Sequence, residues 1–181
     1  MKPLSTLGYM HLSTLAKPVC DRAIYRTIKK NQFRSFIEIG LGDGLRSQNL
    51  IRVAKKFGVS SNIRYTGVDE FDARETGPAL PLIQMHKTLK AMEAKTQLVP
   101  GNAQSAIARI ANSHVRTDMI VISGVVEQSE LEASWFYFPR MLHSGSIVMV
   151  QNKPDEAFRF FTRLQIEKLA QKHPLNSSKA A

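Results

Sequence analysis

The sequence predicts an α/β fold of three layers, with a mostly parallel five-stranded sheet between two layers of helices. Short apolar segments alternate along the chain with longer segments in which apolar residues recur at helical spacing. The short segments lack the apolar–polar alternation of a half-exposed strand. This indicates burial on both faces, and therefore parallel strands covered by helices.

The strands and helices follow one another in regular order after Pro18, which suits the first turn of a helix. The predicted strands are residues 36–39, 63–69, 96–99, 118–123 and 146–150. The predicted helices are residues 19–30, 47–57, 82–95, 103–112, 129–142 and 156–172. No internal repeat interrupts this order, so one domain is expected over residues 18–173.

Both ends of the chain lie outside this pattern. Residues 1–17 have no clear period and are expected to form an N-terminal arm or loop, while residues 174–181 are expected to be a disordered tail. The helix predicted after Val150 leaves no room for a further strand, so the edge of the last strand is expected to be open. Proteins rarely leave such an edge unprotected. Pairing with a second copy as a homodimer, or cover by the N-terminal arm, would protect it.

Composition limits the kinds of site that are possible. Cys20 is the only cysteine among the 181 residues, which excludes a disulfide framework and a zinc site built on clustered cysteines. The cytoplasm, which keeps thiols reduced, is the expected compartment. No run of 18 apolar residues occurs, so no membrane span is expected.

The net charge of +10 is concentrated at the two ends of the chain. The first predicted helix carries four basic residues on one side: Arg22, Arg26, Lys29 and Lys30. Such a face either is simply solvated or attracts an anionic partner such as RNA. Because the sequence contains no dedicated RNA-binding module, nucleic acid ranks below a small molecule as the partner.

The most informative segment is the loop between the first strand and the next helix, which contains Gly40, Gly42 and Gly44. Glycine permits a positive φ and lets a ligand approach the backbone, and the free N–H groups at a helix start suit a carboxylate or phosphate. Asp69, at the end of the next strand, can bind both hydroxyls of a ribose. The dinucleotide pattern G-x-G-x-x-G would need glycine where Leu45 stands. A mononucleoside site is therefore favoured over a dinucleotide site.

The pattern E-x-G-x-G-x-G at residues 38–44 resembles the first motif of the class I S-adenosylmethionine-dependent methyltransferases, and the similarity covers most of residues 36–152. The resemblance implies a Rossmann-like sandwich with strand order 3-2-1-4-5 and S-adenosyl-L-methionine as cofactor. It implies that the glycines face the methionyl part, that Asp69 binds the ribose, and that Asn102 and Ala103 lie near the adenine. The cofactor-binding residues implied are Glu38, Gly40, Leu41, Gly42, Asp43, Gly44, Ser47, Asp69, Glu70, Asn102, Ala103 and Ser123.

The sequence departs from the family where a methyl acceptor would be activated. In a closely similar subgroup, acids and a histidine follow the fourth and fifth strands and bind a metal or act as a base. Here those positions hold Ser123, Val126 and Asn152 among others. No metal site and no catalytic residue are predicted, and His86 and His143 are expected to be surface and loop residues.

Two functions of different classes follow from the resemblance. The first is a methyltransferase that acts on an unidentified small-molecule acceptor, of which an RNA-directed methyltransferase is a further form. The second is a catalytically silent subunit that binds S-adenosylmethionine or its demethylated product, because the polar residues at the strand ends are missing.

Overall fold

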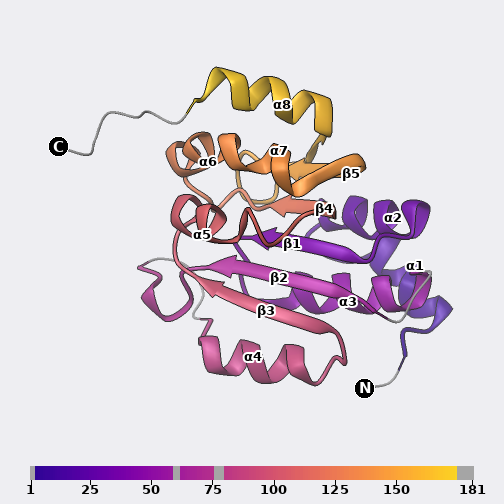
Figure 1. Cartoon of the computed structure of the whole chain (residues 1–181). Coiled ribbons are helices and arrows are strands. Elements are labelled where there is room, and N and C mark those ends of the chain that lie inside the picture. Colours follow the sequence, from indigo (N-terminus) through magenta and orange to yellow (C-terminus); the bar gives the residue numbers. More distant parts are fainter. Residues whose placement is uncertain (1–2, 59–61, 76–79, 175–181) are drawn as a thin grey trace.

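The computed structural model describes residues 3–58, 62–75 and 80–174, and it shows a six-stranded sheet between two layers of helices (Figure 1). The strand order is β3-β2-β1-β4-β5-β6. The strands are β1 (Ser35–Ile39), β2 (Arg64–Asp69), β3 (Lys95–Pro100), β4 (Thr117–Ile122), β5 (Leu142–Val150) and β6 (Arg159–Thr162). The first five are parallel, and β6 is antiparallel to β5. The α/β fold class and the order of the first five strands are thereby confirmed.

Each face of the sheet has its own helices. One face packs against α1 (Thr6–Thr14), α2 (Asp21–Asn31), α3 (Leu45–Phe57) and α4 (Leu82–Lys90). The other packs against α5 (Ala103–Ile110), α6 (Gln128–Ser134), α7 (Phe138–Met141) and α8 (Arg163–Lys172). Short 3-10 turns are η1 (Phe71–Ala73) and η2 (Trp135–Tyr137). Along β1, Phe36 joins the first core and Ile37 the second, because successive side chains of a strand point to opposite faces.

The segment after β5 differs from the predicted single helix over residues 156–172. Residues 159–162 form β6, with Arg159 opposite Val150, and α8 begins only after Thr162, which makes a capping box with Gln165. A strand of four residues is too short for its alternation to stand out beside the helical spacing that follows. The expectation of an open β5 edge is therefore wrong, because β6 covers it. The argument for a homodimer through that edge no longer holds.

The N-terminal segment also differs from expectation, because residues 6–14 form α1 rather than an irregular arm. Ser5 caps this helix by accepting a hydrogen bond from the Gly8 N–H at 2.9 Å. Tyr9 is buried, and its ring meets that of Phe57 edge-on at 4.6 Å between centroids. The helix packs against α2 and so belongs to the folded body. Most of the predicted tail, residues 175–181, lies outside the described residues.

The predicted helix over residues 129–142 is divided in the structure into α6, η2 and α7, and β5 begins at Leu142 rather than at residue 146. Within the described ranges, no helix combines the length and apolar character that crossing a membrane requires.

Candidate functional site

The loops that follow β1, β2, β3 and β4 meet along the carboxyl edge of the sheet, which places most of the predicted site residues together. The Gly40 N–H donates to the Val68 carbonyl at 2.9 Å, and the Ser123 N–H donates to the Ile39 carbonyl at 2.9 Å. The chain runs from β1 to β2 and β3 on one side and returns to β4 on the other. Open α/β sheets typically bind ligands beyond the strand ends at such a reversal.

Glycine is required at the three loop positions for different structural reasons. A Cβ atom on Gly40 would lie 2.9 Å from Val125, and one on Gly44 would lie 2.8 Å from the Met85 sulfur. A Cβ atom on Gly42 would meet nothing within 4 Å, and its φ of +63° favours glycine. Gly40 and Gly44 therefore allow close packing, whereas the open space suited to a ligand lies beside Gly42.

Glu38 lies beneath the loop and is fully buried. Its Oε2 accepts hydrogen bonds from the Ser47 hydroxyl at 2.7 Å and the Tyr65 hydroxyl at 2.6 Å. Burial raises the pKa of the Glu38 carboxyl to about 7, against the opposing charge of Arg46. Because Ser47 is also fully buried, both residues support the loop from below rather than line an accessible surface.

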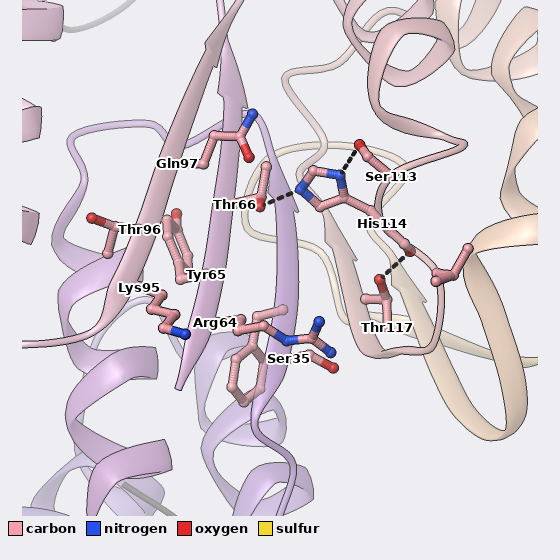
Figure 2. Close-up of a pocket in the computed structure, with 12 residues that line it drawn as sticks. Ser35, Arg64, Tyr65, Thr66, Lys95, Thr96, Gln97, Ser113, His114 and Thr117 are labelled. Carbon is pink, nitrogen blue, oxygen red and sulfur yellow. Dashed lines mark hydrogen bonds between the residues drawn. The ribbon is translucent and has the colours of Figure 1, made fainter. Parts of the chain in front are cut away.

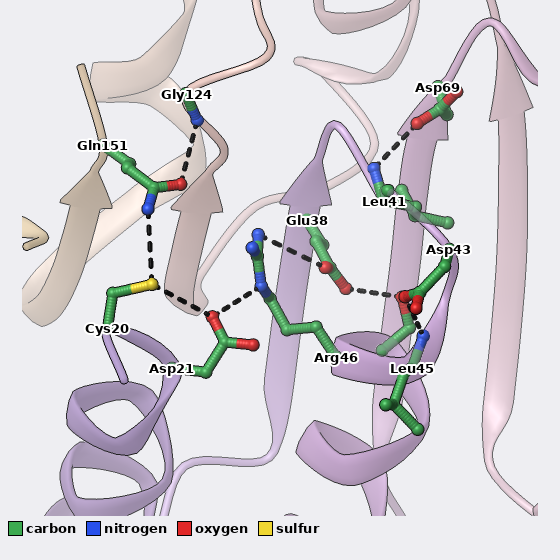
Figure 3. Close-up of polar contacts among 12 residues, drawn as sticks. Cys20, Asp21, Glu38, Leu41, Asp43, Leu45, Arg46, Asp69, Gly124 and Gln151 are labelled. Atoms are coloured by element: carbon green, nitrogen blue, oxygen red, sulfur yellow. Dashed lines mark hydrogen bonds and ion pairs between the residues drawn. The ribbon is translucent and has the colours of Figure 1, made fainter. Parts of the chain in front are cut away.

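A chain of buried polar contacts connects this carboxylate to the start of α2 (Figure 3). Arg46 lies 3.9 Å from Glu38 and donates from Nε to Asp21 at 2.9 Å. Burial is the largest effect on Asp21 and raises its pKa, even with Arg46 beside it. The next residue along this chain of contacts is Cys20, whose sulfur lies 3.9 Å from the Asp21 carboxylate.

The loop after β5 completes this group of contacts. The Gln151 amide donates to the Cys20 sulfur at 3.3 Å and to the Glu156 carbonyl at 2.8 Å, and its oxygen accepts from the Gly124 N–H at 3.1 Å. The backbone of Lys153 packs directly on Gly124, where a Cβ would lie 2.2 Å from the Lys153 carbonyl carbon. The loop therefore covers the end of β4.

The sequence analysis missed these connecting residues, and no local signal identifies them. Cys20 and Gln151 are 131 positions apart, and Asp21 and Arg46 are 25 apart. Only the folded arrangement of α2, α3 and β5 brings them together.

Asp69 lies where predicted, at the end of β2, and points at the glycine loop (Figure 3). Its Oδ2 accepts from the Leu41 N–H at 2.7 Å, and its Oδ1 accepts from the Phe71 N–H at 3.0 Å. Arg74 also donates to Oδ1, from Nη2 at 2.5 Å and from Nε at 3.2 Å, and its Nη1 donates to the Gly42 carbonyl at 3.0 Å. Three of these donors meet Oδ1, whereas the hydrogen bond given for Oδ2 is the one from the Leu41 N–H. In this arrangement Asp69 holds the loop, and Oδ2 keeps a lone pair that can accept a further hydrogen bond.

The neighbouring site residues have simpler surroundings. Glu70 is exposed, and no hydrogen bond to its carboxylate occurs within the described part of the chain. Asp43 is exposed and accepts from the Leu45 N–H at 2.9 Å, at the start of α3. Asn102 caps α5 through its Oδ1, which accepts from the Ser105 N–H at 3.0 Å. The Ala103 N–H donates to Glu130 of α6 at 3.0 Å, a contact that the sequence did not indicate.

The titratable residues outside this group do not form a second reactive cluster at the carboxyl edge. His143 lies near the start of β5 and contacts Asp118 at 3.0 Å, and His86 is exposed on α4. Among residues 3–58, 62–75 and 80–174, no three His, Cys, Asp or Glu side chains are grouped as metal ligands would be.

Comparison with known proteins finds relatives in structure alone. No protein-family model and no curated protein matches the sequence. An O-methyltransferase from Bacillus cereus in complex with SAH matches with a TM-score of 0.57 at 12% identity, over 91% of this chain and 76% of that one. A putative caffeoyl-CoA O-methyltransferase from Staphylococcus aureus matches with a TM-score of 0.55 at 17% identity, over 92% and 79%. A TDP-rhamnose 3'-O-methyltransferase of calicheamicin biosynthesis matches with a TM-score of 0.56 at 16% identity, over 98% and 79%.

The chain spans 63% of one further match, a cofactor-bound protein from MTB, at 15% identity and a TM-score of 0.55. At such identities the likeness shows a shared fold. The Rossmann-like fold predicted from the resemblance is confirmed.

Proposed function

We propose that this protein is a methyltransferase that binds S-adenosyl-L-methionine at the carboxyl edge of its sheet and methylates a small molecule. The observation that carries the proposal is the open space beside Gly42, directly before the start of α3. The partial positive charge of a helix start suits the carboxylate of the cofactor's methionyl part. The Bacillus cereus neighbour, whose structure contains SAH, supports the same cofactor.

The residues present fit the rest of such a ligand. The backbone at Leu41, Gly42 and Asp43 would lie along the methionyl part, with Gly40 and Gly44 fixing the loop from behind. The Nδ2 atom of Asn102 has no hydrogen-bond partner within the described ranges and would donate to an adenine nitrogen, beside Ala103. Ser123, buried at the end of β4, lies on the remaining side of the loop.

We assign the ribose hydroxyls to Glu70 rather than to Asp69. Asp69 is buried and is already bonded to Leu41, Phe71 and Arg74, whereas the carboxylate of Glu70 is exposed. This gives the two acids separate tasks, with Asp69 holding the loop and Glu70 binding the ligand.

The chemistry needs little from the protein beyond positioning. When bound, the cofactor supplies a methyl group on a positively charged sulfur, which is already an activated leaving group. Holding the acceptor in line with that bond supplies much of the rate. The loop that Gln151 ties to Gly124 covers the end of β4 and would keep water from this part of the site. An acceptor that loses its proton late needs no general base.

A small acceptor is favoured over RNA for two reasons. The loop over Gly124 narrows the edge beside β4, and the buried groups there, Ser123 and Gln151, are neutral. The structural neighbours named for caffeoyl-CoA and TDP-rhamnose act on small molecules by their names.

A second function, a subunit that binds the cofactor without transferring its methyl group, is favoured by one observation. The side chains at the acceptor edge are bonded to the protein itself, since Gln151 uses its amide on Cys20, Gly124 and Glu156. This leaves few polar groups there to hold an acceptor.

Calorimetric titration with S-adenosylhomocysteine tests cofactor binding. We expect the natural chain to bind and Gly42→Val to lose binding, because the new side chain fills the open space. Gly145→Ala is the matched control, since Gly145 lies in β5 far from the loop and a Cβ there comes no closer than 3.3 Å to His143. An absence of binding by the natural chain would overturn the proposal.

Transfer of a labelled methyl group separates the two functions. Labelled cofactor is incubated with the protein and either a small-molecule filtrate of a cell extract or its RNA fraction. Label in a small molecule supports the enzyme, and label in RNA contradicts the small-molecule acceptor. Binding without any transfer favours the silent subunit.

A further inference from the structure

A hollow lies at the opposite, amino-terminal edge of the sheet. It has a volume of about 490 Å³ and is bordered by the first residues of β1, β2, β3 and β4 and by the turn after α5 (Figure 2). Pockets that hold small ligands typically have about 300–1,000 Å³. Tyr65 borders this hollow and also donates to Glu38, but none of the residues proposed to bind the cofactor lines it.

Two cations lie on neighbouring strands in the wall of this hollow. Arg64 of β2 and Lys95 of β3 are direct partners in the parallel register, and Thr66 and Gln97 are the next pair on the same face. Like charges at paired positions of a sheet destabilise it. Both side chains are exposed, so solvent screens part of this repulsion and a bound anion would remove the rest.

No acidic side chain of the described chain compensates these charges. Neither Arg64 nor Lys95 forms an ion pair there. The remaining segments, residues 1–2, 59–61, 76–79 and 175–181, contain no Asp or Glu in the sequence. Asp118, the acid at the start of β4, is bonded to the backbone of Arg34 and Ser35 and to His143.

The other side of the hollow presents neutral polar groups held in fixed positions. His114 Nε2 lies 2.9 Å from the buried Thr66 hydroxyl, and its Nδ1 lies 2.9 Å from the Ser113 hydroxyl (Figure 2). Burial lowers the pKa of His114, and the charge of Arg64 lowers it further. Nδ1 also lies 3.2 Å from the Ile110 carbonyl, so the imidazole and the Thr66 hydroxyl use their protons within the protein. Arg64 and Lys95, with the Gln97 amide beside them, are the donors that an oxyanion requires.

We propose that this hollow is a second ligand site, in which Arg64 and Lys95 together bind the phosphate group of a small phosphorylated molecule. The volume exceeds that of inorganic phosphate, so the Thr66, Gln97 and His114 side is available to the organic part of the ligand. Free phosphate shares the same chemistry and is distinguished by experiment.

The test is calorimetric titration at low ionic strength with glucose 6-phosphate, pyrophosphate and inorganic phosphate, with glucose as the uncharged reference. We expect binding of the phosphorylated ligands and not of glucose, and at least a tenfold loss in Arg64→Ala/Lys95→Ala. Arg26→Ala/Lys30→Ala removes the same charge from the exposed face of α2 and should leave binding unchanged. In the natural chain, NMR signals of Thr66 and His114 should shift on titration and those of Gly42 should not.

The variant Lys95→Glu distinguishes a loss of binding from a loss of folding. It places a carboxylate opposite Arg64, so the midpoint of thermal unfolding should stay equal or rise while phosphate binding is lost. Weaker binding of glucose 6-phosphate than of inorganic phosphate would assign the site to the free anion and overturn the organic ligand. Equal loss in the α2 control, or binding of RNA alone, would overturn the site itself.

Discussion

The carboxylate of Asp69 accepts a hydrogen bond from the backbone N–H of Leu41, with 2.7 Å between Oδ2 and the nitrogen. The end of β2 thereby holds the loop that leaves β1. The same carboxylate neutralises Arg74, which in turn donates to the Gly42 carbonyl. One buried acid therefore fixes the loop from both sides.

Replacement of Asp69 by alanine should destabilise the fold strongly. It leaves Arg74 without its carboxylate and two backbone N–H groups without an acceptor, and breaking a buried ion pair typically costs about 3–5 kcal/mol. The free energy of unfolding in urea measures the effect. Asp43→Ala is the control, because Asp43 is exposed and loses only its bond to the Leu45 N–H, a loss of about 1 kcal/mol. Equal effects of the two changes would contradict the anchoring role of Asp69.

Glu70→Gln should weaken binding of S-adenosylhomocysteine by about tenfold or more without changing the unfolding midpoint. The change removes the charge that strengthens the bonds from the ribose hydroxyls, and a hydrogen bond to a charged group contributes about 1.5–3 kcal/mol. Glu75→Gln, also exposed and five residues further along the chain, should leave affinity unchanged. If Asp69→Asn weakens binding and Glu70→Gln does not, the ribose lies at Asp69 after displacement of Arg74.

How far the sequence determines these features depends on whether they are local. The strands and the position of the glycine loop were predictable, because apolar segments, glycine spacing and a terminal acid all lie within short windows. The strand order followed from the resemblance that these motifs carry, and not from the local pattern. The partner of Asp69 was not predictable, because an acid at the end of a strand gives the same sequence pattern whether it binds a ribose or Arg74.

The helix α1 and the strand β6 were not predicted from the sequence, for a related reason. In α1 the buried set includes Ser13 while Leu7 and Met10 are exposed, so the helix has no apolar stripe to reveal it. In β6 the four residues owe their conformation to pairing with β5 rather than to their own pattern. Both depend on tertiary contacts, which local periodicity does not record.

Glu38 should make the stability of the protein fall as pH rises from about 4.5 to 7. Its pKa is raised to about 7 in the folded state, so the folded protein binds more protons than the unfolded one in this window, and stability decreases with pH. The contribution is on the order of 3 kcal/mol, present in full below pH 4.5 and lost above 7. In Glu38→Gln this dependence should be absent.

The comparison needs unfolding free energies of both proteins at pH 4.5 and pH 7.5, since the difference between them cancels the other titrating groups. The disadvantage of the Glu38→Gln variant should shrink at pH 7.5. A difference that stays constant with pH would mean that Arg46 and the two hydroxyl donors keep Glu38 ionised throughout.

Gly124→Ala should open the loop after β5. A Cβ at this position would lie 2.2 Å from the Lys153 carbonyl carbon and 2.5 Å from its oxygen, so the backbone of the loop must move. Overpacking of this kind costs about 1–3 kcal/mol, and the hydrogen bond from the Gly124 N–H to Gln151 would be strained with it. Hydrogen exchange of residues 151–158 should accelerate while exchange in β1 and β2 stays unchanged. Gly145→Ala, in β5 but away from this loop, should leave the exchange pattern as it is; protection of residues 151–158 in both variants would show that the loop does not rest on Gly124.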